Sequence, residues 1–182
     1  MKYYHVSSQL HEGCQINPVN KKFSGLSHYA EETKIKDEKD FINVYNYLKD
    51  FNVKMKTGRT PEKWLCEIIF ENIRKQYYNS MPSRIYGTYL CANLDEARRF
   101  NREYRDGKAS IFELDIDDEV LFFDMNIFTL AETSLYSITD VKNVFENCEK
   151  LAHNYWSEFC ENSIKEKEYI YDKNIIIGKK IL

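Results

Sequence analysis

The sequence predicts an α+β domain, because helical and strand patterns occupy different parts of the chain. Apolar residues recur at helical spacing in the middle, over 37–54 and 61–78. Strand patterns lie at the beginning and in the second half. The chain has 182 residues, of which 43% are apolar and 30% charged. This size and composition suit a single domain spanning residues 1–182 with a core of its own.

The N-terminal region is expected to begin with a strand and to continue as loops. The aromatic run over 2–7 predicts the strand. Residues 13–18 predict a turn into a short extended piece, which Pro18 ends. Residues 19–36 are polar and show no clear period, so we expect a surface loop there.

Two helices are expected next. The apolar spacing over 37–54 predicts the first one, and residues 57–61 interrupt it. Thr60 as N-cap and Pro61 at the first helical position predict the start of the second. We expect this helix to run to about Tyr78.

The stretch 83–100 changes from a strand to a helix. An apolar and aromatic run over 85–91 predicts a strand, and Asn93 is the predicted N-cap of a helix that continues to about Tyr104. The start of a helix offers free backbone donors, so a junction of this kind suits a ligand.

Gly87 and Tyr89 lie in this predicted strand, and two interpretations of them stay open. The glycine would let a ligand approach the backbone, and the tyrosine would offer a flat ring for stacking. Alternatively, Tyr89 is a core aromatic residue and Gly87 marks a bulge.

The second half is expected to contain two strand pairs and one helix. Residues 110–116 and 119–125 are predicted to form a hairpin. A helix is expected over 138–156. The final runs, 166–171 and 175–182, are predicted to pair through a tight polar turn.

Composition argues against several classes of protein. A net charge of −3 and a pI near 5.9 argue against broad capture of nucleic acid, although a local basic patch stays open. The five cysteines and four histidines show no zinc-binding spacing, so we expect free thiols, a reducing cytoplasm and no metal. No apolar run of 18 residues and no signal-peptide pattern occurs, so no membrane contact is expected.

Further polar residues lie within predicted strands. His5 lies in the middle of the first strand, with Ser7 on the same face. Glu166 and Glu168 share a face at the start of a late strand. A lone strand histidine is more often structural than functional, and glutamates beside lysines are usually a solvated strand entrance.

Taken together and in this order, these residues resemble the ADP-ribosyltransferase superfamily in its His-Tyr-Glu branch. That family places a histidine on the first strand, here Tyr4-His5-Val6-Ser7. It places a tyrosine after a glycine in a strand that leads to a helix, here Gly87-Thr88-Tyr89-Leu90. It places a glutamate at the start of a late strand, here Glu168-Tyr169-Ile170-Tyr171. Residues 67–74 and 81–84 look more narrowly like a bacterial domain family of unknown function within that superfamily.

The resemblance spans nearly the whole chain and implies an ADP-ribosyltransferase-like split β-sheet core with several helices. It implies an NAD-dependent mono-ADP-ribosyltransferase that modifies an intracellular macromolecule, either protein or nucleic acid. NAD is then the substrate and no metal is needed. Cleavage of the bond between nicotinamide and ribose builds positive charge on the ribose, which Glu168 would stabilise.

The resemblance also implies how NAD is bound. His5 would bind the ribose of the adenosine half, supported by Ser7, and the backbone near Val6 would bind the nicotinamide amide. Tyr89 would stack on the nicotinamide ring. Arg84 is a candidate for the pyrophosphate, since guanidinium pairs with phosphate oxygens in fork geometry.

Two alternatives accompany this expectation. One is a non-catalytic module of the same fold that binds a nucleotide, ADP-ribose or a partner; the other is an RNA 2′-phosphotransferase-like enzyme. Glu166 with Glu168 forms a Glu-x-Glu pair, which marks transfer to arginine in other branches, but no Ser-Thr-Ser strand accompanies it. A toxin or phage-defence role, with an antitoxin or regulatory partner, is a further expectation from the resemblance.

Overall fold

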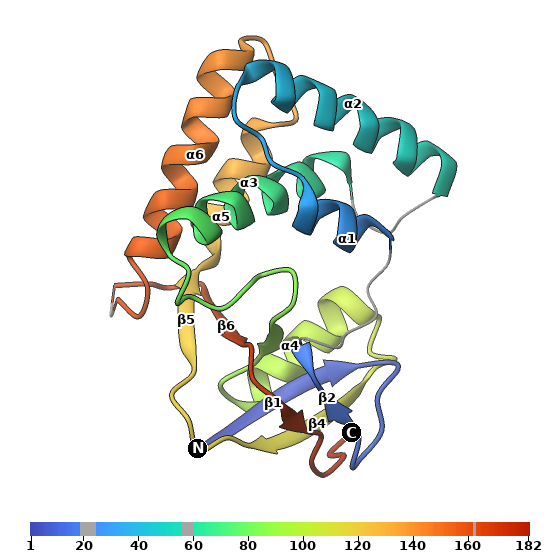
Figure 1. The fold of residues 1–182 in the computed structure, drawn as a ribbon. Helices are drawn as coiled ribbons and strands as arrows, with labels where there is room; N and C mark the ends of the chain where they lie inside the picture. The colour runs from blue at the N-terminus through green and yellow to red at the C-terminus, as the bar shows by residue number, and fades with distance from the viewer. Residues whose placement is uncertain (19–24, 56–59, 162) are drawn as a thin grey trace. The chain divides into compact units, whose positions relative to one another are not determined.

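The computed structural model describes residues 1–18, 25–55, 60–161 and 163–182 (Figure 1). The chain divides into two compact units, each assembled from separate segments. Unit 1 takes the described parts of Met1–Lys22 together with Tyr86–Phe122 and Glu168–Leu182, and unit 2 takes the described parts of Phe23–Ile85 together with Phe123–Lys167. Helices and strands are both present, so the prediction of a mixed α and β fold is confirmed.

Two strand pairs of unit 1 join distant parts of the chain. β1 (Lys2–Ser7) pairs antiparallel with β4 (Ser110–Asp115), as Figure 1 shows. β2 (Gln15–Ile16) pairs antiparallel with β7 (Ile175–Ile176). The predicted first strand, 2–7, is therefore confirmed.

A third sheet has the order β3 (Thr88–Leu90), β6 (Lys167–Tyr171) and β5 (Leu121–Asp124). β3 and β6 are antiparallel, and β5 carries the chain from unit 1 into unit 2. β3 is shorter than the apolar run over 85–91 suggests.

These pairings correct two predictions. Residues 110–125 do not form a hairpin, because β4 pairs with β1. Residues 166–182 do not form one either, because β6 pairs with β3 and β7 pairs with β2. The reason is burial: strand residues distant in sequence share one apolar cluster, and the additional closure entropy of a long loop is small beside that gain. The cluster contains Tyr3, Ile16, Leu90, Phe112, Leu114, Ile116, Val120, Tyr171, Ile175 and Ile177.

Helix α4 (Leu94–Arg105) packs against β1 and β4. Its N-cap is Asn93, as predicted, and the Asn93 side chain accepts a hydrogen bond from the Glu96 backbone N–H at 2.9 Å. A second cluster holds the helix on the strands, formed by Val6, Ala97, Ala109 and Ile111.

Gly178 is a position where the backbone leaves no room for a side chain. A Cβ there would overlap the backbone carbonyl oxygen of Glu113, whose own N–H donates to the Lys179 carbonyl at 2.9 Å. We expect Gly178→Ala to lower the free energy of unfolding by about 1–3 kcal/mol, the usual cost of overpacking. Urea unfolding measures this, and Lys179→Ala, at an exposed side chain, should change little. Equal stability of the Gly178→Ala chain would contradict the close approach.

Three helices of unit 2 follow their predictions. α2 (Glu38–Met55), α3 (Pro61–Tyr77) and α6 (Val141–Ser157) match the expected segments closely. The Thr60 hydroxyl accepts a hydrogen bond from the Lys63 N–H at 3.2 Å, which confirms the predicted N-cap. Of the predicted break between α2 and α3, residues 57–59 lie outside the described residues.

Two helices of unit 2 were not predicted. α1 (Gly25–Glu32) forms where a surface loop was expected, and it buries Leu26 and Ala30. Residues 19–24 of that loop prediction lie outside the described residues. α5 (Met125–Ser134) begins directly after β5, with Asp124 as N-cap.

Aromatic side chains fill the core of unit 2. Tyr155 stacks on Phe123 with ring centroids 4.9 Å apart, and Trp156 lies edge-on to Phe123 at 5.1 Å. The Trp156 indole N–H donates to the Phe70 carbonyl at 2.9 Å, so its polar edge is satisfied in the interior. Among the helices of the described residues, none has the length and apolar character that crossing a membrane requires.

Candidate functional site

Three adjacent strands of unit 1 carry the histidine, tyrosine and glutamate that the sequence singles out. Tyr4 in β1 and Cys91 exchange two backbone hydrogen bonds, at 2.9 and 2.8 Å, so β1 lies beside the end of β3. On its other side β3 pairs with β6, with Tyr89 opposite Ile170. His5, Tyr89 and Glu168 therefore come from neighbouring strands although they are far apart in sequence.

His5 contacts the backbone of Tyr89 directly. Its ring nitrogen Nδ1 lies 2.9 Å from the Tyr89 carbonyl oxygen. A carbonyl oxygen only accepts hydrogen bonds, so Nδ1 carries the proton and donates it. In the neutral ring, Nε2 is then the nitrogen that can accept a hydrogen bond.

The strand register decides which side chains share a face. Directly opposite residues of an antiparallel pair lie on one face, and so do residues two apart within a strand. Tyr89 and Ile170 are opposite each other, and Glu168 is two residues before Ile170, so Tyr89 and Glu168 share a face. Diagonal neighbours of this kind have Cα atoms about 7–8 Å apart, which long side chains can bridge.

The same rule separates His5 and Ser7 from that face. Tyr4 pairs with Cys91, which is two residues after Tyr89, so Tyr4 and Val6 lie on the Tyr89 face. His5 and Ser7 alternate with them and point to the opposite face. The Ser7 hydroxyl accepts a hydrogen bond from the Gln9 N–H at 3.2 Å, in the turn that ends β1.

The face of Tyr89 and Glu168 is also the face on which α4 packs. Cys91, Tyr4 and Leu94 are half-buried against the cluster that fixes α4 to the strands. Tyr89 and Glu168 are themselves half-buried.

Burial, assisted by the negative charge of Glu96, raises the pKa of the Cys91 thiol to about 11. The thiol is therefore protonated at neutral pH and is a poor nucleophile.

The turn between β3 and α4 is fixed by Glu96. One Glu96 carboxylate oxygen accepts from the Ala92 N–H at 3.1 Å, and the other from the Asn93 side-chain amide at 2.8 Å. Together with the Asn93 cap this is a reciprocal capping arrangement. The spacing of Asn93 and Glu96 is the sequence signal that could have identified Glu96 as the residue that positions this turn.

Arg84 lies in the core of unit 2. Its side chain is 2% exposed and pairs with the Glu67 carboxylate at 2.9 Å. It also donates to the Tyr155 hydroxyl at 2.7 Å, and its guanidinium lies 3.8 Å from the centre of the Phe128 ring. These contacts use the guanidinium nitrogens of Arg84 that the sequence analysis expected to bind a pyrophosphate. We therefore leave Arg84 out of the site that we propose below.

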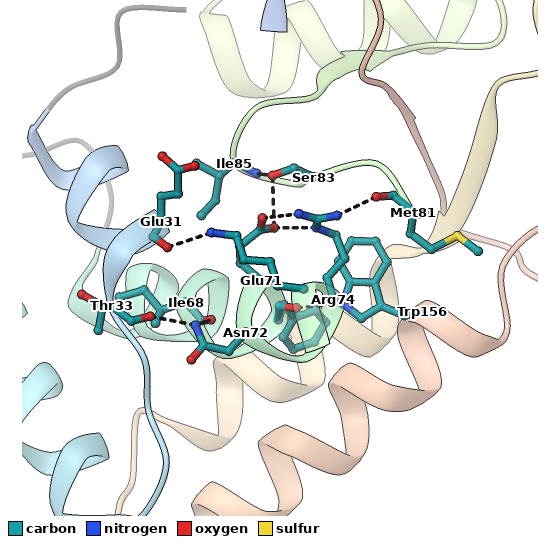
Figure 2. A network of polar contacts seen from close by, with 12 residues as sticks. Glu31, Thr33, Ile68, Glu71, Asn72, Arg74, Met81, Ser83, Ile85 and Trp156 are labelled. Atoms are coloured by element: carbon teal, nitrogen blue, oxygen red, sulfur yellow. Dashed lines mark hydrogen bonds and ion pairs between the residues drawn. The ribbon is translucent and has the colours of Figure 1, made fainter. Parts of the chain in front are cut away.

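Glu71 is a second buried acid of α3, and it holds the segment that leads to Arg84. Figure 2 shows the Glu71 carboxylate between Arg74, at 2.7 and 3.0 Å, and the Ser83 hydroxyl at 3.1 Å. Arg74 also donates to the Met81 carbonyl at 2.9 Å. Sequence reasoning missed both acids, although Glu67 and Glu71 lie among the apolar residues of α3, which is unusual for ionised side chains.

A pocket of about 380 Å³ lies in unit 2. Its walls come from α1, α3, α6 and the segment that joins α1 to α2. The Asn72 side chain holds this joining segment: it accepts a hydrogen bond from the Ile35 N–H at 2.9 Å and donates one to the Thr33 carbonyl at 2.8 Å. The amide of Asn72 is used by these bonds, so it does not mark a ligand. Within the described ranges, no group of three or more His, Cys, Asp or Glu side chains could hold a metal ion.

Comparison with known proteins gives a family and no activity. The family model described as "Protein of unknown function (DUF2441)" matches residues 3–182, which is almost the entire chain. No curated protein matches the chain. The chain belongs to the DUF2441 family.

Proposed function

We propose that this protein uses NAD as a substrate and transfers its ADP-ribose part to a macromolecule. The observation that supports the proposal most is the meeting of β1, β3 and β6, which brings His5, Tyr89 and Glu168 onto neighbouring strands. Tyr89 and Glu168 share a face there, and His5 binds the Tyr89 carbonyl. Their order and strand contexts are those of the His-Tyr-Glu pattern described above.

Glu168 is the residue that the proposed chemistry needs most. The bond between the ribose and the nicotinamide nitrogen breaks, and its electron pair leaves with nicotinamide. Positive charge develops on the ribose, and a carboxylate held beside it stabilises this transition state more than the ground state. A nucleophilic atom of the acceptor then bonds to the same ribose carbon and releases its proton to water.

His5 and Tyr89 have linked roles in the proposal. The Tyr89 ring stacks on the nicotinamide, next to Glu168 on the same face. His5 holds the Tyr89 carbonyl through Nδ1, so it positions the strand that presents the ring.

Removing the Tyr89 ring should weaken NAD binding. We expect Tyr89→Ala to cost about 1–3 kcal/mol of binding free energy, the scale of a flat base stacked on an aromatic side chain. Titration calorimetry with NAD measures the change, and Tyr89→Phe is the matched control because it keeps the ring. If the Tyr89→Ala chain binds NAD as tightly as the wild type, the ring does not contact NAD. If that chain is unfolded, Tyr89 is a core residue.

The direct test is to incubate the purified protein with labelled NAD and to follow free nicotinamide and the label. Release of nicotinamide with transfer of label to a component of a cell lysate supports the transferase. NAD binding without release would replace it by a non-catalytic binding module. Activity on 2′-phosphorylated RNA without NAD cleavage would replace it by a phosphotransferase.

A further inference from the structure

The pocket of unit 2 is built on one face of α3. Four of its lining residues follow a single stripe of that helix, at spacings of three, one and three: Ile69, Asn72, Ile73 and Gln76. Glu31 and residues 33–36 form one wall, and Phe145 and Glu149 of α6 form another. The enclosed volume of about 380 Å³ falls within the roughly 300–1,000 Å³ that small-molecule sites occupy.

Both walls are held in place by contacts of their own. The Lys75 ammonium donates a hydrogen bond to the Glu31 carbonyl at 2.8 Å, and Asn72 bonds the same wall at two further points. Figure 2 shows the bonds at Glu31 and Asn72. On the α6 wall, the Phe145 ring packs against Phe41 of α2, with ring centroids 5.5 Å apart. The pocket is therefore a preformed part of the fold.

Charges of both signs line the pocket. The cations are Lys34, Lys36 and Lys75, and the anions are Glu31 and Glu149. Because the two signs nearly balance, the lining complements neither a simple anion nor a simple cation. It suits a small ligand that carries both charges.

Glu149 is the charged residue whose environment favours a ligand most. Its side chain is half-buried, and among the described residues none donates a hydrogen bond to its carboxylate or forms an ion pair with it. Burial raises the pKa of Glu149, and the charge of His153, one turn further along α6, offsets this only in part. A carboxylate that loses water without gaining a donor costs free energy, so an ammonium group placed beside it would be stabilising.

Lys34 and Lys36 supply the opposite charge on the facing wall. Both side chains are exposed, and neither forms an ion pair within the described part of the chain. The acids that follow them in sequence are occupied at the start of α2. Asp37 accepts from the Asp40 N–H at 2.9 Å, and Asp40 accepts from the Lys36 backbone N–H at 3.2 Å. The two ammonium groups can therefore receive a carboxylate.

We propose that the pocket of unit 2 binds a free apolar amino acid in its zwitterionic form. Glu149 receives the α-ammonium group, and Lys34 and Lys36 receive the α-carboxylate. The apolar side chain lies against the apolar part of the lining, which consists of Ile35, Ile69, Ile73 and Phe145. This inference does not rest on the proposed function, because all of these residues belong to unit 2 and none of them has a role in NAD cleavage.

The test compares amino acids with analogues that lack one charge. Titration calorimetry of the full chain is run with L-phenylalanine, L-leucine, 3-phenylpropionate and phenethylamine. 3-Phenylpropionate is phenylalanine without its ammonium group, and phenethylamine is phenylalanine without its carboxylate. We expect 3-phenylpropionate to bind roughly 10- to 100-fold more weakly than phenylalanine, the scale of a hydrogen bond to a charged group. Phenethylamine should bind about 2- to 5-fold more weakly, because the lysines are exposed.

Variants then assign each charge to its partner. Glu149→Gln should weaken phenylalanine and phenethylamine and leave 3-phenylpropionate unchanged. Lys34→Gln combined with Lys36→Gln should weaken phenylalanine and 3-phenylpropionate and leave phenethylamine unchanged. The matched controls are Lys150→Gln and Glu158→Gln, at exposed side chains of α6 and its C-cap outside the pocket lining, and they should bind every probe like the wild type.

Three results would overturn the inference. The first is no binding of phenylalanine or leucine at millimolar concentration. The second is binding of either analogue as tightly as phenylalanine, which needs no variant and so does not depend on how the variants fold. The third is unchanged phenylalanine binding in a Glu149→Gln chain whose circular dichroism melting curve matches that of the wild type.

Discussion

Replacing Glu168 by glutamine should remove nearly all of the release of nicotinamide from NAD while the protein stays folded. Glutamine keeps the size of the side chain and removes only the charge that the proposed transition state needs. We expect kcat to fall by roughly 100- to 1000-fold, the range found when one electrostatic stabiliser of a transition state is lost. Chromatographic measurement of nicotinamide, beside NAD titration calorimetry, separates this loss of turnover from a loss of binding.

Glu166 offers a control within the same strand entrance. Its side chain is exposed, and its backbone carbonyl accepts a hydrogen bond from the Met125 N–H at 2.9 Å, which Glu166→Gln leaves in place. This variant should turn over NAD like the wild type. Loss of activity in Glu166→Gln with retention in Glu168→Gln would transfer the proposed role to the other member of the Glu-x-Glu pair.

Replacing Arg84 by methionine should cost about 3–5 kcal/mol of unfolding free energy, because it leaves the Glu67 carboxylate buried without its charged partner. Both side chains are only 2% exposed, so water cannot compensate for the loss. This is a large part of the roughly 5–15 kcal/mol that holds a typical domain together. Urea unfolding followed by tryptophan fluorescence suits the measurement, since Trp156 lies in the core of the same unit.

The double variant Glu67→Met with Arg84→Met is the matched comparison. It removes both charges, and buried ion pairs replaced by apolar residues are often close to neutral. We expect it to be more stable than Arg84→Met alone, although the Tyr155 hydroxyl loses the donor that lies 2.7 Å away. A single variant that loses less than about 1 kcal/mol, below the cost of breaking a buried pair, would show that Arg84 is not part of the core.

Local signals in the sequence were enough for the helices that have strong caps. Thr60 with Pro61 and Asn93 with Glu96 define the starts of α3 and α4, because cap side chains bond to backbone N–H groups within three residues. α5 was missed because its N-cap, Asp124, is the last residue of β5 and lay within the strand predicted over 119–125, and no helix was expected before residue 138. The strand pairings were wrong for another reason: neighbours in sequence were assumed to pair.

The candidate site was predictable only in part. The contexts of His5, Tyr89 and Glu168 were visible in the sequence, but their common location depends on which strands are adjacent, and that is decided by burial between distant segments. The register then places His5 and Ser7 on the face opposite Tyr89, which no local pattern reveals. For Arg84, the partner Glu67 sits one helix earlier, and guanidinium chemistry alone does not distinguish a buried carboxylate from a phosphate.

The pairing of β3 with β6 also sets when the proposed activity can first arise during protein synthesis. Helices α2 and α3 meet within one continuous part of the chain, so they can pack soon after they are made. β3 and β2, in contrast, receive β6 and β7 only when residues 167–176 have emerged from the ribosome. A nascent chain that stops before Glu168 carries His5 and Tyr89 but neither the carboxylate nor the strand that completes their sheet. If the proposed function holds, unfinished chains should therefore release no nicotinamide from NAD.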